Sequence, residues 1–418
     1  MKNLVLGLRK LRTDTVQFFA ENRLDGLPIR THLKGYSAGA LRKDLKAGLD
    51  VALLGLPQGM AYASIAGLPI VYGIMCGAVA SIVGPLFASS RHTVLGPTNA
   101  TAFMVSASMF ASANPAVLSE NLLLMPLLVL MVGLLLVIGA FFRFADLIQY
   151  ISRSVVVGYI TGAAVLITAN QLKHVLGFDR EVATGRTFFS IVISTWNALE
   201  STQWIPLALA IGTMTLFWLL RKKLPRFPAF AGVLVIMSAV GYILESTDWF
   251  TQLGGSLPTL KEFNASDIGL KVPDLGDGLV VDRISPLFGI AIAVAFLAAL
   301  ENSIMGKTLG SRTGQQPDMN QDMLSVGITN IWTGFFSGMP ASGSLTRSAL
   351  NHESGSASPI STIFSGVLCL IGAFTLGYLA QYVPKSVLAA LGLQQVSLFV
   401  EFVFDQMGLR RFTQIKHN

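Results

Sequence analysis

The segment SGSLTRSAL, residues 342–350, places a permanently charged side chain, Arg347, among serines and a threonine. Apolar runs long enough to cross a bilayer lie on both sides of it. Such a cation has two interpretations: its charged end can reach back to the membrane surface, or it can belong to a site for a negatively charged ligand. The second is favoured, because the segment is short, its flanks are small and polar, and the first half of the chain contains a similar segment.

The composition predicts an all-α polytopic membrane protein. Of the 418 residues, 52% are hydrophobic and only 13% are charged, whereas soluble domains carry about 25% charged residues. The motifs typical of hydrolases, nucleotide-binding loops and metal-dependent enzymes do not occur in the sequence. We therefore expect no enzymatic activity, no catalytic residues, no cofactor and no metal. Cys76 and Cys369 both lie in apolar runs and are expected to be buried, inert thiols.

The excess of positive charge indicates topology. The net charge is +7, but the lysines and arginines gather next to apolar runs, in the basic segment 1–46, in RKKLPR (221–226) and in LRRFTQIK (409–416). Cytoplasmic flanks of membrane spans carry such clusters. We therefore expect a multi-pass protein of the cell inner (plasma) membrane with a cytoplasmic N-terminus, in contact with the lipid bilayer and with no nucleic-acid partner.

Apolar segments of about 20 residues predict the membrane spans. Two further segments, 98–112 and 344–356, are too short to span alone. Residues 184–200 have the pattern of an amphipathic helix at the membrane surface. The predicted spans are 47–67, 70–90, 121–141, 153–176, 204–221, 227–245, 284–309, 318–338, 359–382 and 384–402.

The two halves of the chain resemble each other weakly. Each contains a Gly-rich span, a short loop and a small-polar half-helix, the last around GPTNATAF (96–103) in the first half and GSLTRSAL (343–350) in the second. Paired segments of this kind predict an inverted-repeat transporter whose site lies between the repeats. The expected domains are the basic N-terminal segment 1–46, a first repeat at 47–245, a loop at 246–283, a second repeat at 284–402 and a basic tail at 403–418.

Two half-helices that meet at membrane depth would give Arg347 a function. Each helix N-terminus carries roughly half a positive charge and free N–H groups. Thr98 suits the start of the first half-helix, and Ser342, Ser344 and Thr346 are candidate N-caps of the second. Together, the two N-termini and the arginine predict an anion site.

Gln58 and Glu301 are polar side chains deep in predicted spans. A carboxyl group such as Glu301 usually faces the interior of a membrane protein, where it can take up and release a proton. Alternatively, Glu301 is a structural partner of Lys307 or Arg347. Gln58 follows Pro57, so it either contacts a ligand or sits in a packed kink, satisfied by a neighbouring helix.

At these residues the sequence resembles the sulfate permease (SulP) family, the relatives of prestin and pendrin. The resemblance lies in LPQGMAYASIAGLPIVYG (56–73), AALENSIMGK (298–307), SGSLTRSALNHESG (342–355) and VPKSVLAAL (383–391), and it is collinear over about residues 40–395. It implies an inverted-repeat (7+7 type) transporter fold in which a core domain holds the substrate and moves like an elevator against a gate domain. This chain looks like a bacterial-type member without a STAS domain.

The resemblance also implies roles for individual residues. The coupling acid of the family corresponds to Glu301. The family's anion site corresponds to Gln58, Tyr62, Thr98, Asn99, Ala100, Ser344, Thr346 and Arg347.

The chain ends where the last two gate spans of this fold would begin. We therefore expect a fragment of a longer protein that is a homodimer at full length. One face of the last predicted span, residues 391–399, would then meet lipid instead of protein.

Several functions remain open. The leading expectation is secondary active transport of a small inorganic anion, with sulfate as the first candidate, coupled to H+ through Glu301. A sodium-coupled bicarbonate transporter, in which Glu301 binds Na+, is the nearest alternative, and a dicarboxylate carrier is another. A protein of a different class, an anion channel-like or voltage-sensing membrane element, would also fit these residues.

Overall fold

The computed structural model describes residues 24–109, 115–148, 150, 153–178, 188–224, 228–247, 257–260, 269–270, 272, 278–376 and 378–406. By length and composition, four helices in these ranges could cross a membrane. They are Ile70–Phe87, Ser119–Phe141, Trp204–Lys223 and Asp282–Thr313.

Helices form most of the described structure. In chain order the elements are α2 (Ile29–His32), α3 (Ala38–Ala66), α4 (Ile70–Phe87), β1 (Leu95–Gly96), α5 (Asn99–Met109), α6 (Pro115–Phe141), α7 (Phe144–Ile148), α8 (Arg153–Val175), α9 (Phe188–Asn197), η1 (Leu199–Ser201), α10 (Trp204–Lys223), α11 (Ala229–Glu245), α13 (Gly278–Thr313), α14 (Met319–Phe335), β2 (Ser342–Gly343), α15 (Leu345–Glu353), α16 (Ile360–Leu376), η3 (Tyr378–Tyr382) and α17 (Lys385–Gln406).

The predicted spans and half-helices all correspond to helices, although some boundaries differ. The short segments 98–112 and 344–356 form α5 and α15. Helix α3 starts before the predicted span 47–67, because the Ser37 hydroxyl caps it by accepting a hydrogen bond from the Ala40 amide. Residues 359–382 divide into α16 and the 3-10 helix η3 instead of one continuous span.

The contacts between helices are exchanged between the two halves. Helix α14 of the second half packs against α6, the helix that follows the half-helix α5 of the first half. In the same way, α4 of the first half packs against α16, the helix that follows the half-helix α15 of the second half. Both contacts depend on glycine: a side chain at Gly327 would collide with the backbone at Val137, and one at Gly366 would collide with the Ala78 carbonyl. Small residues let membrane helices approach closely. The paired contacts are those of an inverted repeat.

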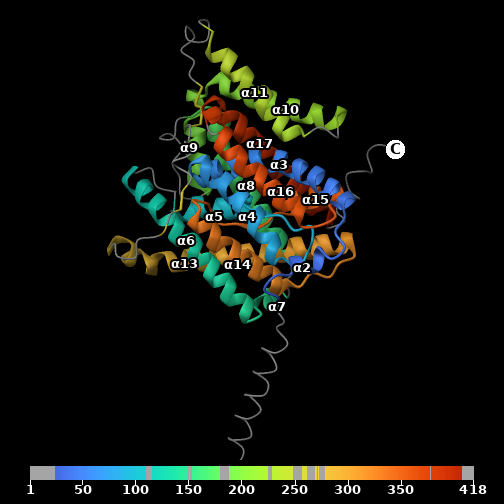
Figure 1. Cartoon of the computed structure of the whole chain (residues 1–418). Coiled ribbons are helices and arrows are strands. Elements are labelled where there is room, and N and C mark those ends of the chain that lie inside the picture. The colour runs from blue at the N-terminus through green and yellow to red at the C-terminus, as the bar shows by residue number, and fades with distance from the viewer. Residues whose placement is uncertain are drawn as a thin grey trace, which may run out of the picture.

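A second group of helices lies beside this one. Helices α8 and α10 pack on α17, and α10 also packs on α11. In Figure 1, α10 and α11 lie on the far side of α17 from α14 and α6. The expectation that the 391–399 face meets lipid is wrong for Leu391 and Val396. Both side chains are buried, and Leu391 belongs to an apolar cluster with Leu209 and Val233 of α10 and α11.

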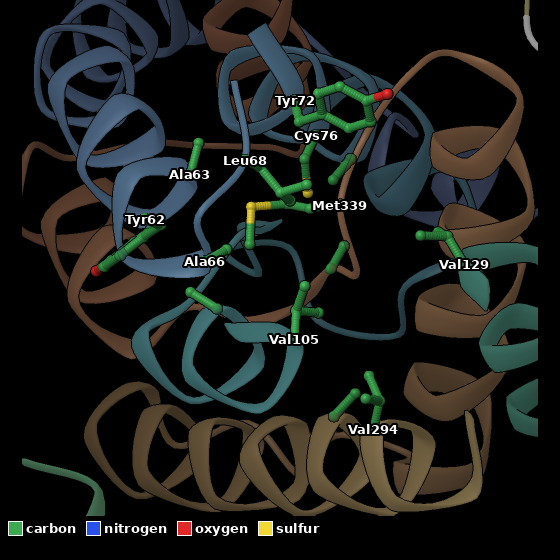
Figure 2. Close-up of a cluster of buried hydrophobic side chains, with 14 of the residues drawn as sticks. Tyr62, Ala63, Ala66, Leu68, Tyr72, Cys76, Val105, Val129, Val294 and Met339 are labelled. Carbon is green, nitrogen blue, oxygen red and sulfur yellow. The ribbon is translucent and has the colours of Figure 1, made fainter. Parts of the chain in front are cut away.

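The largest apolar cluster surrounds the short segments. Figure 2 shows Tyr62 of α3, Cys76 of α4, Val105 of α5 and Val294 of α13 in this cluster, together with Met339, which precedes β2. Cys76 and Cys369 are buried free thiols, as predicted. Because the cluster takes side chains from both halves, apolar packing helps to hold α5 between them.

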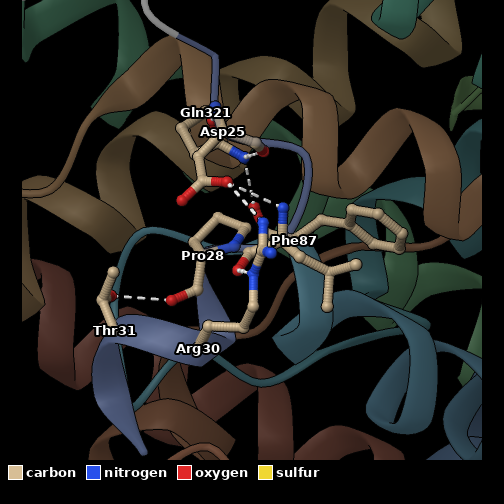
Figure 3. A network of polar contacts seen from close by, with 7 residues as sticks. Asp25, Pro28, Arg30, Thr31, Phe87 and Gln321 are labelled. Atoms are coloured by element: carbon tan, nitrogen blue, oxygen red, sulfur yellow. Dashed lines mark hydrogen bonds and ion pairs between the residues drawn. The ribbon is translucent and has the colours of Figure 1, made fainter. Parts of the chain in front are cut away.

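Polar contacts fasten the ends of the first group of helices. The Gln321 side chain of α14 accepts from the Asp25 amide at 2.8 Å and donates to the carbonyls of Asp25 and Phe87 at 3.0 and 2.7 Å (Figure 3). Asp44 of α3 is fully buried, and it accepts hydrogen bonds from the Ala357 and Ser358 amides and the Tyr36 hydroxyl. These contacts join the start of α3 and of α14 to loops of the opposite half.

Candidate functional site

The two half-helices meet at a two-stranded pairing in the interior. Strands β1 and β2 are antiparallel, with Leu95 opposite Gly343 and Gly96 opposite Ser342. Gly96 has φ 154°, and a side chain there would lie 2.8 Å from Nη2 of Arg347. Sequence reasoning missed both strands, since two-residue strands rich in Gly and Ser carry almost no β signal.

Each half-helix starts directly after its strand. Thr98 caps α5: its carbonyl accepts from the Ala102 amide at 3.0 Å and its hydroxyl from the Thr101 amide at 3.4 Å. Ser344 occupies the N-cap position of α15, but its side chain makes no capping hydrogen bond. Ser342 and Thr346 do not cap this helix, because Ser342 is part of β2 and Thr346 lies in the first turn. The start of α15 therefore has no side-chain cap.

Glu301 of α13 connects the two half-helix starts. Its Oε2 accepts hydrogen bonds from the Thr98 hydroxyl at 2.7 Å and from the Ser342 hydroxyl. These two hydroxyls also lie 3.0 Å from each other. Sequence reasoning considered Lys307 and Arg347 as ionic partners of Glu301, but no ion pair of Glu301 is found among the described residues. The carboxylate is held by hydroxyls from both repeats.

Arg347 is buried in the core and does not reach the surface of the protein. Its side chain is 2% exposed, and Nη2 donates to the Pro97 carbonyl at 2.9 Å, just before α5. Its Nε has no hydrogen-bond partner. Arg347 of the second repeat thus holds, by a hydrogen bond, the residue just before the first half-helix.

The remaining predicted residues lie around the same point. Gln58 and Tyr62 are buried on α3, which packs against both α5 and α15. The amide oxygens of Gln58 and Asn99 are buried without a hydrogen-bond partner. Both oxygens can therefore still accept a hydrogen bond.

The other three residues implied for the anion site lie at the helix starts. Ala100 is buried in the first turn of α5, and the hydroxyls of Ser344 and Thr346 are 3.5 Å apart at the start of α15. No hydrogen bond joins either hydroxyl to Glu301 among the described contacts. The small Ala100 side chain leaves the backbone of α5 open to close approach.

One polar face of α15 holds the segment that leads into β1. The Ser344 amide donates to the Val94 carbonyl at 3.0 Å, and the Ser348 hydroxyl accepts from the Val94 amide at 2.9 Å. Asn351 donates to the His92 carbonyl at 3.3 Å. Sequence reasoning missed these contacts, although the spacing of Ser344, Ser348 and Asn351 places them on one helical face. The two half-helices are therefore one connected unit.

Asn330 of α14 positions β2 in the same way as a neighbouring strand would. Its side chain accepts from the Ala341 amide at 2.8 Å and donates to the Ala341 carbonyl at 2.9 Å. Its amide also donates to the Val326 carbonyl within the helix. Because Ala341 precedes Ser342 directly, this clamp sets the place of a hydroxyl that binds Glu301.

Replacing Asn330 by leucine, which has a similar volume, is expected to destabilise the protein and disturb Glu301. Each buried backbone group of Ala341 left unpaired costs about 1–3 kcal/mol. Because the Ser342 hydroxyl loses its position, the pH dependence of transport is expected to move as well. Thermal unfolding and uptake at a series of pH values measure the two effects.

Thr333→Val is the matched control for that substitution. The Thr333 hydroxyl makes a hydrogen bond within α14, to Thr329, and does not contact β2. This variant is expected to keep the wild-type pH dependence. An unchanged pH profile in Asn330→Leu would contradict the positioning role.

The two half-helices meet at one strand pair, and helices of each repeat pack against helices of the other. This arrangement defines an inverted-repeat membrane transporter. The sulfate permease family matches this chain over residues 41–412. The chain belongs to that family. Its relatives are transporters and not enzymes.

Named relatives share about a quarter to a third of the aligned residues. The probable sulfate transporter 4.2 of Arabidopsis thaliana is 30% identical, over 86% of this chain and 52% of the relative. The putative sulfate transporter YvdB of Bacillus subtilis is 27% identical, over 85% and 64%. The sodium-independent sulfate anion transporter of Bos taurus is 27% identical, over 93% and 66%. The chain thus spans roughly half to two thirds of these proteins.

Solved structures with the same fold confirm the predicted architecture. The transmembrane domain of the cyanobacterial bicarbonate transporter BicA has a TM-score of 0.77 at 18% identity, over 88% of this chain and 90% of that domain. The murine solute carrier 26 family member A9 anion transporter, in its inward-facing state, has a TM-score of 0.79 at 21% identity, over 92% and 65%. At these identities the likeness concerns the fold alone.

Proposed function

We propose that this protein is a secondary active transporter of sulfate, driven by H+ through Glu301. The observation that carries the proposal is the hydrogen-bonded bridge from Glu301 to Thr98 and Ser342, one from each repeat. A proton on Glu301 would compete with these hydroxyl donors, because a protonated carboxyl has less capacity to accept. Protonation can therefore change how the two half-helix starts are held.

The anion is proposed to bind at the helix starts, beside this bridge. Two helix N-termini favour a negative ligand there, and the start of α15 has no side-chain cap. The buried charge of Arg347 adds to their field. The predicted site residues Gln58, Tyr62, Thr98, Asn99, Ala100, Ser344, Thr346 and Arg347 keep this role as part of the proposal.

Movement of the core as a unit is also part of the proposal. The polar face of α15 is bonded to the segment before β1, so the two half-helices would move together. Helices α8, α10, α11 and α17 pack mainly among themselves, as expected for a gate against which an elevator-like core would slide. A homodimer in the inner membrane, with a cytoplasmic N-terminus, completes the proposed arrangement.

A sodium-coupled bicarbonate transporter is the second candidate. It is favoured by the oxygen atoms of Thr98, Thr101, Ser342 and Glu301, which form one hydrogen-bonded group. Oxygen ligands of this kind suit a hard cation. The bovine relative, by contrast, is named as sodium-independent, which speaks against sodium as the coupling ion.

Uptake into proteoliposomes separates these candidates. The purified protein is reconstituted, and radiolabelled sulfate, bicarbonate and fumarate are supplied with an imposed H+ or Na+ gradient. We expect uphill sulfate uptake driven by the H+ gradient alone. Uphill bicarbonate uptake driven only by Na+ would establish the second candidate. Downhill flux that ignores both gradients would indicate a channel-like protein.

A further inference from the structure

Helix α9, which the proposed transport mechanism does not use, has an exposed apolar face. Its inward face is buried at Ile191 and Thr195, and the helix packs against α8. The spacing of a helix places the polar side chains along one edge, between the inward and the exposed faces. The exposed face consists of Phe189, Val192, Ile193 and Trp196. The polar edge consists of Ser190, Ser194 and Asn197.

The position of α9 along the bundle is set by the start of α10. Residues 198–203 connect the two helices, and α9 also packs against η1 within this connection. The Gln203 amide donates to the Leu176 carbonyl, just after α8, at 3.0 Å. The end of α8, the helix α9 and the start of α10 therefore lie together. In Figure 1, α9 lies on the left, whereas α2 and α15 lie on the right.

Helix α10 indicates where the bilayer surfaces lie. Its 20 residues extend over about 30 Å, the thickness of the hydrocarbon core. Trp204, Ile211 and Trp218 are exposed at intervals of seven residues, which places them on one face. Near the other end, Nζ of Lys222 lies 4.9 Å from the centre of the Trp218 ring, and the last turn is basic. Tryptophans mark both membrane surfaces and basic clusters mark the cytoplasmic one, so Trp204 and α9 belong to the opposite surface.

The exposed face of α9 suits lipid better than a second copy of the chain. Its two aromatic side chains can each bury about 150–250 Å², whereas a stable interface buries about 800 Å² on each partner. The face also lies beside Trp204, where the exposed stripe of α10 begins. A helix with one apolar face and one polar edge lies in the plane of a membrane surface, with the apolar face toward the acyl chains.

We propose that α9 is an anchor in the non-cytoplasmic surface of the bilayer, with its apolar face among the lipid acyl chains and its polar edge in water. Because α9 is packed on α8 and connected to α10, it would fix the depth of these two helices in the membrane. The proposal does not depend on which anion is transported or on how transport is coupled.

Fluorescence quenching measures the depth of α9. A variant that keeps Trp196 as its only tryptophan, with phenylalanine at the other tryptophan positions, is reconstituted into phosphatidylcholine vesicles. The lipids carry bromine either near the headgroup or near the end of the acyl chains. We expect stronger quenching of Trp196 by the shallow bromines, and little quenching by aqueous iodide. A thermal unfolding transition shows that the variant is folded.

Two further single-tryptophan variants calibrate this measurement. Trp204 as the only tryptophan is expected to give the same order of quenching as Trp196. Ile211→Trp as the only tryptophan is expected to reverse the order, because it lies half-way along α10. Strong quenching of Trp196 by iodide would place α9 in water. Protection of Trp196 from both iodide and bromine would show that protein covers the face, and either result would overturn the proposal.

Neighbouring cysteine variants test the orientation of α9 independently. Ser194→Cys lies on the polar edge and Ile193→Cys on the apolar face. A membrane-impermeant maleimide added from the non-cytoplasmic side is expected to label Ser194→Cys at least tenfold faster, because a thiol among acyl chains is poorly ionised and poorly reached. The wild-type protein is the background control, since Cys76 and Cys369 are buried.

The labelling result can contradict the anchor in two ways. Equal rates for the two variants would show that both sides of α9 meet water. Oxidative cross-linking of two protomers through Ile193→Cys would assign the face to a second copy of the chain. Neither measurement requires sulfate transport, so a failure of the proposed function would leave this test unchanged.

Discussion

Replacing Glu301 by glutamine is expected to abolish pH-driven accumulation of sulfate while exchange of anions across the membrane continues. Glutamine has the shape of the protonated acid and can still accept hydrogen bonds from Thr98 and Ser342. It cannot bind and release a proton, so a pH gradient has no group through which to act. Radiolabelled sulfate uptake with and without an inward H+ gradient measures accumulation, and counterflow measures exchange.

A matched variant shows whether the loss of accumulation comes from the carboxyl group of Glu301 or from the hydroxyls around it. Thr101→Val removes a hydroxyl that contacts Thr98 but makes no recorded contact with Glu301, so it is expected to keep pH-driven accumulation. If Glu301→Gln still accumulates sulfate in response to an imposed pH gradient, coupling occurs elsewhere. If Glu301→Gln instead abolishes sodium-driven uptake, the second candidate function gains support.

Replacing Arg347 by alanine is expected to weaken sulfate binding roughly ten- to a hundred-fold, which corresponds to about 1.5–3 kcal/mol. Two effects combine in this prediction. The variant removes the buried positive charge beside the helix starts, and it removes the hydrogen bond that braces the Pro97 carbonyl. The sulfate dissociation constant is measured by isothermal titration on purified protein.

Arg347→Lys distinguishes charge from geometry. Lysine keeps the charge but lacks the planar fork of N–H donors through which Arg347 reaches the Pro97 carbonyl. Partial recovery of sulfate affinity would assign most of the effect to charge. Wild-type affinity in a folded Arg347→Ala protein would remove Arg347 from the proposed site.

Much of the architecture follows from local chemistry that a sequence displays directly. The length of an apolar segment indicates whether it can span the membrane, so the segments that form α4, α6 and α10 could be predicted without tertiary information. The short segments that became α5 and α15 stood out because Gly, Pro and small polar residues interrupt otherwise apolar runs. Glu301 and Arg347 were conspicuous for a related reason: an ionisable side chain between apolar runs costs too much to occur without a function.

The partners of those charges depended on the tertiary fold. No spacing rule connects Glu301 with Thr98, which is 203 residues away, or Arg347 with Pro97, at a separation of 250 residues. The pairing of β1 with β2, and the clamp of Asn330 on Ala341, arise only when the two halves cross. Sequence alone could therefore show which side chains need partners. Which atoms satisfy them was decided by the antiparallel pairing of β1 with β2, where the two half-helices begin. Contacts between segments far apart in the sequence are set by packing and not by local pattern.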